Sequence, residues 1–339
     1  MKVSVICLTY NHQAYVRQSL DGFVMQKTNF PFEVWVGDDA STDKTPAIVS
    51  EYAAKYPDII KPVLRKENVG PAENAHDLYR RVTAPYVAIC EGDDYWTDPL
   101  KLQKQADFLD AHPDFSLCFH PVAVCYDNNA PTKEIFPEKS KLFYKKKPTY
   151  RELLKGNFIQ TNSVLYRWRF HKDSLNLLPK DIQPADWFMH LLHAQIGKIG
   201  FLPDVMGVYR RHGNGMWTDA GKTDDWFIKH GPSHLRFYLT FQKQFSVSKK
   251  VSIGKLLFDI SLAALNRNDE KTISFLKETF PKEFEDIVFY LKNYSAFTEI
   301  KEKILSKITF GFNHKMMKHH LKRKPAIKEF LLKNSGKGV

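Results

Sequence analysis

The sequence predicts an α/β fold: a parallel sheet with helices on both faces, followed by a helical C-terminal region. In the first half of the chain, short apolar runs rich in β-branched residues alternate with segments whose apolar residues recur at helical spacing. From His234 onward only the helical spacing remains. Alternation of strand and helix is typical of parallel sheets covered on both faces, so these two observations define the class.

The expected strands are buried apolar runs that end at polar residues or turns. Residues 3–10 form the first such run, and the helix after it places Val16, Leu20 and Phe23 on one face. The same alternation predicts strands at residues 32–37, 59–64, 86–90, 163–166, 199–202 and 205–209, with one or two more in 115–126. It predicts helices at residues 15–25, 72–82, 100–109 and 185–196, a short helix from Tyr150, and a helix that begins at Ser41 or Thr42. The aperiodic segments 127–147 and 213–225 are expected to be loops.

Length and composition allow one large domain with an appendage. The chain has 339 residues, of which 43% are hydrophobic. Its four cysteines (Cys7, Cys90, Cys118 and Cys125) show no CxxC spacing, which favours small buried side chains in a reducing compartment over disulfides or a zinc site. The sequence shows no secretion signal and no apolar run near the roughly 20 residues of a membrane span, so we expect a cytoplasmic protein.

The positive charge is concentrated at the C-terminus. Of the formal net charge of +12, residues 301–339 carry +9, from eleven Lys or Arg and two Glu. In residues 315–324 the cations alternate with apolar residues, which fits a segment lying on an anionic membrane surface. A solvated basic helix or an unstructured tail would have the same composition. Nucleic-acid binding is disfavoured because no recognition motif accompanies the charge.

Polar side chains follow three of the predicted strands and should meet at one edge of the sheet. They are Asn11 and His12, then Asp38 and Asp39, then Glu91-Gly92-Asp93-Asp94. In open α/β sheets this carboxyl edge is where ligands bind. Crowded carboxylates repel one another unless a cation neutralises them, which indicates a hard divalent metal. The alternative is a solvated acidic turn before the next helix, with Thr97 or Asp98 as the N-cap.

The motifs of several common ligand sites are absent: no GxGxxG follows the first strand, and neither GxxxxGK[ST] nor GxSxG occurs. Four other segments follow in order: VSVICLTYN at 3–11, VGDDASTD at 36–43, NVG at 68–70 and EGDD at 91–94. Together they resemble the family 2 glycosyltransferases of the GT-A fold, over about residues 1–215. The resemblance implies a Rossmann-like GT-A domain over residues 1–230 and a helical, basic region over residues 231–339.

The resemblance also implies a nucleotide-sugar donor, usually a UDP-sugar, inversion at the anomeric carbon, and Mn²⁺ or Mg²⁺ as cofactor. The implied donor-binding residues are Thr9, Tyr10, Asn11, Asp38, Asp39, Asn68, Glu91, Asp93, Arg210 and Arg211. The implied metal ligands are Asp93, Asp94 and His212, and the sequence does not separate Asp93 from Asp94. Glu91 stands where the family has the first Asp of its DxD motif, which leaves the ribose contact of this position open.

Two of these assignments, and one neighbouring segment of the second motif, have a structural alternative. Tyr10 would serve equally as a core aromatic at a strand end, and His212 as a structural histidine. Ser41-Thr42-Asp43 is better explained as a helix N-cap than as a ligand-binding segment.

An inverting transfer needs a base that takes the proton from the acceptor hydroxyl. Asp186 matches the position of this base in the family, near the start of a helix, and Asp181 is the next candidate. A carboxylate stabilised by the helix dipole is the alternative for Asp186. Its neighbour Trp187 is either a sugar-stacking platform or a core residue. The segment 161–163 (TNS) lies where acceptor contacts are found in the family.

The sequence therefore predicts a metal-dependent inverting glycosyltransferase that builds a surface polysaccharide, such as a capsule or lipopolysaccharide, or a glycolipid. Its expected partners are the donor, a glycan or lipid-linked acceptor and, through residues 301–339, the inner face of the cytoplasmic membrane. One alternative is a nucleotidyltransferase, which would need a glycine-rich loop after the first strand. The other is an inactive sugar-nucleotide-binding scaffold of a glycan assembly complex.

Overall fold

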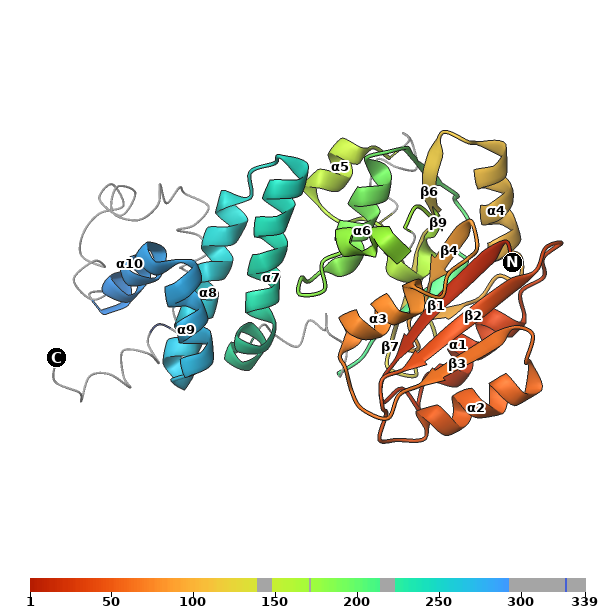
Figure 1. Ribbon diagram of the computed structural model, residues 1–339, viewed down its shortest axis with the longest axis horizontal. Helices are drawn as coiled ribbons and strands as arrows, with labels where there is room; N and C mark the ends of the chain where they lie inside the picture. Colours follow the sequence, from red (N-terminus) through yellow and green to blue (C-terminus); the bar gives the residue numbers. More distant parts are fainter. Residues whose placement is uncertain (139–147, 171, 214–222, 293–326, 328–339) are drawn as a thin grey trace. The chain divides into compact units, whose positions relative to one another are not determined.

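The computed structural model describes residues 1–138, 148–170, 172–213, 223–292 and 327 (Figure 1). The chain forms two compact units. The sheet unit comprises Met1–Lys180 and Ala185–Thr218, and the helical unit comprises Asp181–Pro184 and Asp219–Val339. The chain thus leaves the sheet unit briefly just before Ala185, returns, and leaves it again after Thr218. The predicted domain boundary at residue 230 falls within a helix of the helical unit.

A seven-stranded sheet forms the centre of the sheet unit, in the order β10-β6-β9-β4-β1-β2-β3. Its strands are β1 (Val3–Thr9), β2 (Phe32–Asp38), β3 (Ile60–Leu64), β4 (Tyr86–Ile89), β6 (Phe115–Phe119), β9 (Leu165–Arg167) and β10 (Lys198–Phe201). The expectation of a parallel sheet is wrong at β9, which runs antiparallel to both β4 and β6. The chain enters β9 at the end of the sheet where β4 and β6 terminate, after a 3₁₀ turn at Thr161–Ser163. The other neighbouring strands are parallel.

A second sheet has four strands in the order β5-β11-β7-β8. They are β5 (Tyr95–Trp96), β7 (Val122–Tyr126), β8 (Ile135–Phe136) and β11 (Gly207–Arg211). The predicted strand region 115–126 therefore holds two strands, and they belong to different sheets. Strand β11 is antiparallel to β5, which directly follows the acidic segment 91–94. This pairing brings residues near 210 next to that segment.

The sheet unit has six α-helices in its described part (Figure 1): α1 (Val16–Val24), α2 (Thr45–Lys55), α3 (Pro71–Tyr79), α4 (Lys101–Ala111), α5 (Tyr150–Lys155) and α6 (Ala185–Ala194). The N-cap prediction for residues 41–43 is wrong, because α2 begins only at Thr45 and has no side-chain cap. The Ser41 hydroxyl instead donates to Asp38, and Asp43 accepts from the Thr45 N–H. These side chains shape the loop ahead of the helix.

The core of the sheet unit lies on both sides of the parallel strands. On one side, alternating side chains of β1, β2 and the end of β4 are fully buried: Val5, Cys7, Val34, Val36, Ala88 and Cys90. Ile6 and Val87, which point to the other side, are fully buried as well. All four cysteines are buried and free, as the sequence predicts. Burial raises the pKa of the Cys7, Cys90 and Cys118 thiols, which keeps them protonated and unreactive.

The helical unit contains, in its described part, α7 (Asp224–Phe245), α8 (Lys250–Arg267), α9 (Glu270–Thr279) and α10 (Pro281–Lys292). Helix α7 begins earlier than the predicted helical region because Thr223 caps it, accepting a hydrogen bond from the Trp226 N–H. Asp224 and Asp225, expected to be in the loop 213–225, therefore belong to this helix, and residues 214–222 lie outside the described residues. Apolar side chains from all four helices form a core separate from that of the sheet unit, and Ile327 joins it.

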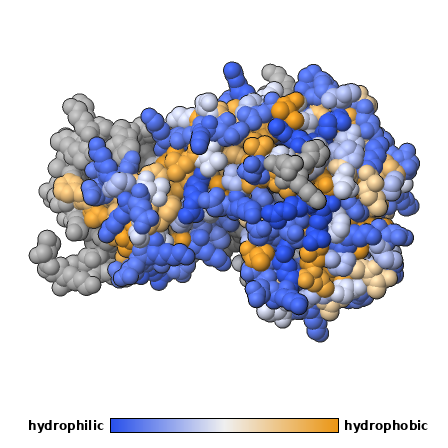
Figure 2. Space-filling view, viewed as in Figure 1, coloured by the Kyte–Doolittle hydropathy of each residue, from blue (hydrophilic) through white to orange (hydrophobic). Residues whose placement is uncertain are grey.

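The surface in Figure 2 is largely hydrophilic, with separate patches of apolar residues. Within the described part of the chain, no helix is both long enough and apolar enough to cross a membrane. Apart from Ile327, residues 301–339, on which the prediction of a membrane-binding segment rests, lie outside the described residues.

Candidate active site

The carboxyl ends of β1, β2 and β4 meet at one edge of the sheet. The N–H of Asp39, just after β2, donates to the Thr9 carbonyl at 3.0 Å. The N–H of Gly92, just after β4, donates to the Leu8 carbonyl at 2.8 Å. Both neighbouring segments are therefore held by hydrogen bonds to the end of β1, so the three polar segments lie together as the sequence predicts.

Gly92 allows the acidic segment to approach β1 this closely. A Cβ atom at this position would lie 2.9 Å from Cβ and Oγ1 of Thr9 and 3.1 Å from Nδ1 of His12. The first distance is shorter than the contacts that real Cβ atoms make. A side chain at position 92 would therefore push the flanking carboxylates away from β1.

Asp93 is the carboxylate of this edge that faces two imidazoles. Its Oδ2 lies 3.0 Å from Nε2 of His212 and 3.9 Å from Nε2 of His12. Burial disfavours ionisation, but the hydrogen bond from His212 and the charge of His12 outweigh it and hold the pKa of Asp93 below its usual value. Asp93 is therefore ionised at neutral pH, and its side chain keeps 20% of its surface exposed.

Asp94 has a different environment although it is the next residue. It is 2% exposed, and its Oδ1 accepts a hydrogen bond from the Arg210 N–H at 2.8 Å. Burial, followed by the charges of Asp93 and Glu91, raises the pKa of Asp94 well above its usual value. Asp94 thus fastens the acidic segment to β11, whereas Asp93 is accessible to a ligand.

The side chains around Asp93 fit a divalent cation that takes most of its ligands from a substrate. Among the described residues, no group of three or more His, Cys, Asp or Glu side chains forms a complete cation site. Asp93 supplies one carboxylate, with His212 and His12 beside it. Magnesium sites that serve phosphate chemistry have this character, since one or two carboxylates and the phosphates share the ion.

Arg210 holds the acidic segment in place. Its guanidinium donates to the backbone carbonyl of Asp93 at 2.7 Å and to Oε1 of Gln18 at 2.5 Å. It lies between the rings of Tyr15 and Tyr95, 4.7 and 5.3 Å from their centroids. The residue is 3% exposed, so protein groups occupy the donors that the sequence assigned to phosphate.

The next residue, Arg211, also faces the protein. Its guanidinium lies 3.0 Å from Oε1 of Glu134 and 3.1 Å from the hydroxyl of Tyr126, both in the second sheet or its connecting loop. In this structure the two arginines assigned to the donor thus stabilise β11 and its neighbours.

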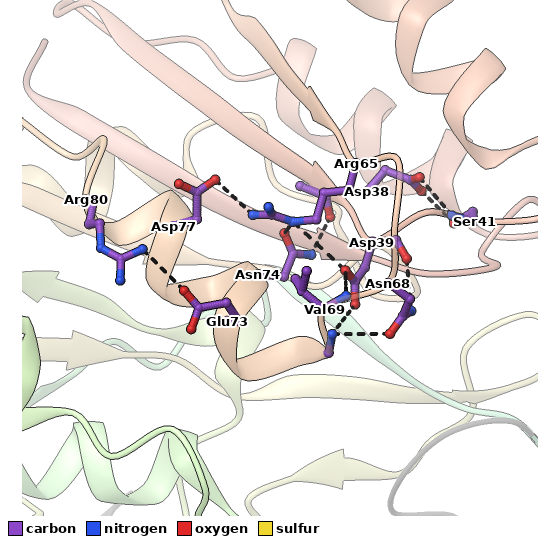
Figure 3. Close-up of polar contacts among 12 residues, drawn as sticks. Asp38, Asp39, Ser41, Arg65, Asn68, Val69, Glu73, Asn74, Asp77 and Arg80 are labelled. Carbon is purple, nitrogen blue, oxygen red and sulfur yellow. Dashed lines mark hydrogen bonds and ion pairs between the residues drawn. The ribbon is translucent and has the colours of Figure 1, made fainter.

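Asp38 and Asp39 bind backbone groups of the loops that surround the edge (Figure 3). Asp38 accepts from the N–H and the hydroxyl of Ser41. The Asp39 carboxylate accepts from the N–H groups of Val69 and Gly70, both at 2.9 Å. Asn68 completes the link by donating from its side chain to the Asp39 carbonyl at 2.9 Å. The aspartates are 1% and 3% exposed, so they fix the conformation of these loops.

The end of β1 presents the groups best placed to meet a ligand. The Thr9 hydroxyl is buried and has no hydrogen-bond partner among the described residues. Tyr10 is 46% exposed, so the alternative interpretation that it is a core aromatic is wrong. Asn11 adopts the left-handed backbone conformation (φ 54°), and its side-chain oxygen accepts from the Thr42 N–H at 2.9 Å.

Asp186 lies in the first turn of α6. Its Oδ2 accepts hydrogen bonds from the Asn157 amide at 3.2 Å and the Thr161 hydroxyl at 3.3 Å. Burial raises its pKa, although the Trp187 N–H and these two side chains oppose the rise. Burial and the charges of Asp93 and Asp186 likewise raise the pKa of Glu91 to about 8, so the carboxylates of the metal motif and the candidate base share one electrostatic environment.

The other residues that the sequence places near the proposed base differ in burial and in what they contact. Trp187 is a core residue and not a stacking platform, because it is 8% exposed and its indole donates to the Leu153 carbonyl. In the segment 161–163, Thr161 touches Asp186, while Asn162 is fully buried and donates to the Val208 carbonyl. Asp181, the second candidate base, lies in the helical unit, 3.5 Å from the guanidinium of Arg236.

The sequence places His12 at this edge, because it is polar and follows the first strand, but assigns it no role. Two further residues near Asp93, Tyr15 and Gln18, are not predicted. Tyr15 and Gln18 lie at the start of a helix and carry no such signal. The Tyr15 and His212 rings lie with their centroids 4.7 Å apart and their planes tilted by 46°, a contact that depends on the pairing of β11 with β5.

The mixed sheet followed by a helical region matches solved structures of the GT-A fold. The sequence profile described as "Glycosyl transferase family 2" matches residues 4–174, and the chain belongs to this family. The predictions of family, enzyme class and fold are thereby confirmed.

Several known proteins are similar to the chain. An uncharacterized protein of Mycobacterium tuberculosis is 47% identical over 218 residues, which span 64% of this chain and 61% of that protein. Poly(ribitol-phosphate) beta-N-acetylglucosaminyltransferase TarS of Staphylococcus aureus is 28% identical over 239 residues, covering 67% of this chain and 39% of TarS.

Two solved structures share the fold. The crystal structure of S. aureus TarS residues 1–349 in complex with UDP-GlcNAc has a TM-score of 0.54 at 18% identity, covering 97% of this chain and 89% of that one. The mannosyltransferase PcManGT of Pyrobaculum calidifontis, in complex with GDP-Man and Mn²⁺, has a TM-score of 0.52 at 17% identity, covering 100% and 88%.

Proposed function

We propose that the protein transfers a sugar from a UDP-sugar to a hydroxyl of a glycan or lipid-linked acceptor, with inversion and with the aid of Mn²⁺ or Mg²⁺. The observation that carries this proposal is the grouping of ionised Asp93, with its two imidazoles, and Asp186, both close enough to act on the charge of Glu91. The similar TarS was solved with UDP-GlcNAc, and the similar mannosyltransferase with GDP-Man and Mn²⁺, which supports a nucleotide-sugar donor and a cation.

Asp186 is the base in this proposal. Its carboxylate takes the proton of the acceptor hydroxyl while that oxygen attacks the anomeric carbon and the nucleoside diphosphate leaves. The raised pKa of Asp186 brings it closer to neutral pH, where a base accepts a proton more favourably. Asn157 and Thr161 hold the carboxylate in position through their hydrogen bonds.

Asp93, with His212 and His12 beside it, would hold the cation. When bound there, a divalent cation supplies positive charge that stabilises the departing diphosphate. Asp94 contributes by fastening the segment to β11, and Arg210 by holding the Asp93 backbone. The free hydroxyl of Thr9, the exposed ring of Tyr10 and the loop at Asn68 form the nucleotide side of the proposed pocket.

We further propose that the acceptor belongs to surface-polysaccharide or glycolipid synthesis, and that residues 301–339 bring the enzyme to the inner face of the cytoplasmic membrane. The name of TarS, a transferase that acts on poly(ribitol-phosphate), supports a polymer as the acceptor. The charge of +9 on residues 301–339 supports the membrane.

The test is donor turnover by Asp186→Asn. With a panel of UDP-, GDP- and dTDP-sugars and Mn²⁺, the native protein should release nucleoside diphosphate slowly in water and faster with an acceptor. Asp186→Asn should bind donor with near-native affinity but turn over at least about a hundredfold more slowly in the acceptor reaction, because the base is lost.

Asp181→Asn is the matched control, since it removes the same charge five residues earlier, at an aspartate whose side chain is 65% exposed. It should keep native turnover. Native turnover by Asp186→Asn would overturn the assignment of the base. A protein that binds donor yet never releases nucleoside diphosphate would be the inactive scaffold, and release of pyrophosphate would identify a nucleotidyltransferase.

A further inference from the structure

A buried histidine lies one helical turn behind the proposed base. His190 follows Asp186 on α6 at the i+4 position and is fully buried. Its Nδ1 lies 2.6 Å from the hydroxyl of Tyr166 on β9, which is also fully buried. Its Nε2 lies 4.0 Å from Oδ2 of Asp186. A line of polar groups therefore runs from β9 through the histidine to the base.

The two neighbours of the ring determine where its proton resides. Burial lowers the pKa of His190 to about 3, so the ring is neutral and carries one N–H. Burial raises the pKa of Tyr166 well above its usual value, so the hydroxyl keeps its proton. Ionised Asp186 can only accept hydrogen bonds. The arrangement that suits both neighbours has Tyr166 donating to Nδ1 and the imidazole proton on Nε2, toward Asp186.

We propose that Tyr166 and His190 are positioning residues for Asp186: the Tyr166 hydroxyl fixes the tautomer of His190, whose Nε2–H then stabilises the carboxylate in its ionised form. This inference rests on the proposed function, in which Asp186 is the base. In this role the neutral imidazole of His190 acts as an oriented dipole and does not exchange its proton with the substrate.

The surroundings of Asp186 show why such a dipole matters. Burial favours the protonated acid and raises the pKa of Asp186. Opposing burial, in direct contact, are the backbone N–H groups of Trp187 and Asp186 and the neutral donors Thr161 and Asn157, whose hydrogen bonds of 3.3 and 3.2 Å are long. No cation pairs with Asp186 among the described residues, so an additional oriented N–H is a substantial part of what keeps it ionised.

The remaining groups that face the pair cannot replace this N–H. His193, on the same helix, lies against Tyr166 with ring centroids 4.3 Å apart, and its Nδ1 lies 3.0 Å from the Met189 carbonyl. Tyr79, on α3, is buried and keeps its proton because burial and the charges of Glu91 and Asp186 raise its pKa. The Ile159 backbone also meets the His190 ring, and it only partly opposes the fall in the pKa of His190 that burial causes.

The experiment measures the titration of Asp186 directly, by ¹³C NMR of its side-chain carboxyl, assigned from the signal lost in Asp186→Asn. In Tyr166→Phe the apparent pKa of Asp186 should rise by about half a unit or more, because the imidazole is no longer fixed. His190→Leu should raise it at least as far. His190→Gln, whose amide can still donate to the carboxylate, should restore part of the shift.

Tyr86→Phe is the matched control. Tyr86 is another buried tyrosine of the same sheet, but its hydroxyl donates to Asp110, and Asp186 does not contact it. This variant should leave the Asp186 titration unchanged. An unchanged titration in Tyr166→Phe and His190→Leu, with both proteins folded by circular dichroism, would overturn the inference.

The titration does not depend on turnover, so the base assignment and the positioning pair can be contradicted independently. If Asp186→Asn keeps native turnover, the base assignment fails whatever the titration shows. If Asp186→Asn is inactive and the titration does not move, only the positioning pair fails. Where both hold, Tyr166→Phe should lower turnover about tenfold, as loss of a partner that orients a functional group does, and should move the acidic limb of the pH profile to higher pH.

Discussion

At the scale of single residues, the acidic segment shows how neighbouring side chains of the same type acquire different roles. The sequence predicts that Asp93 and Asp94 lie at a ligand-binding edge, but it does not separate them. The difference arises from β11, which pairs with β5 and delivers an N–H to Asp94 and an imidazole to Asp93. Because that pairing joins residues more than a hundred positions apart, no local pattern reveals it.

Replacing each aspartate by asparagine should separate the two roles. Burial raises the pKa of Asp94 and favours its uncharged form, and its Oδ1 accepts from the Arg210 N–H as an amide oxygen would, so an amide is a close mimic of it. Asp94→Asn should therefore keep native Mn²⁺ affinity within about threefold in the presence of UDP. Asp93→Asn removes an ionised ligand and should weaken Mn²⁺ binding by at least about tenfold.

Isothermal titration of Mn²⁺ into each protein with UDP present measures both affinities. Chelation with EDTA should abolish the metal-dependent part of UDP binding by the native protein. The opposite ranking, with Asp94→Asn the weaker binder, would make Asp94 the principal metal ligand.

At the scale of elements, the apolar runs predict strand positions well because the central parallel strands β1, β2 and β4 are buried on both faces. β1, β2, β3 and β4 all begin and end within one or two residues of the expected ranges. Strand direction and sheet membership are not encoded in such runs. The antiparallel β9 and the split of 115–126 between two sheets depend on which strands lie beside each other. The cap at Thr223 likewise moved the start of α7 into a segment without apolar periodicity.

The close approach of the β4 and β1 ends leads to a prediction for Gly92→Ala. The added methyl group would overlap Thr9, so the acidic segment has to move away from β1. We expect a loss of stability of about 1–3 kcal/mol, as overpacking causes, and a loss of UDP and Mn²⁺ binding. Chemical denaturation and calorimetry measure the two effects.

Gly156→Ala is the control for this change. A Cβ atom at position 156 meets nothing within 4 Å, and the backbone there is extended, with a φ of −175°. Its stability and UDP binding should stay native. Native UDP binding by Gly92→Ala would show that the pocket does not depend on this contact.

At the scale of the whole molecule, two units with separate cores follow from two separate hydrophobic patterns in the sequence. The detail that no pattern predicts is the short passage Asp181–Pro184, which belongs to the helical unit. Its contacts there include the Gln183 N–H, which donates to the Ser233 carbonyl, and the Asp181–Arg236 ion pair. These partners lie about fifty residues away along the chain, beyond the range of any local signal. Two residues after Pro184 comes Asp186, the proposed base.

The whole-molecule charge distribution leads to a prediction of membrane binding. The full chain should co-sediment with vesicles that contain anionic phospholipid and should fail to do so with neutral vesicles. Each Lys or Arg near an anionic surface contributes about 1 kcal/mol, so half of the eleven in residues 301–339 would suffice for reversible binding. Binding should decrease steeply as salt is raised. Equal binding to both kinds of vesicle, or to neither, would exclude an electrostatic anchor.

The buried thiols give the chain a built-in probe of its own unfolding. All four cysteines of the sequence lie in the sheet unit, and the helical unit has none. Since each thiol is buried and free, a thiol-specific reagent can reach it only when the sheet unit opens. Labelling kinetics on the unaltered protein therefore report the opening of the glycosyltransferase fold alone, while circular dichroism follows both units. Comparing the two signals during denaturation distinguishes loss of the sheet from loss of the helices without introducing a single mutation.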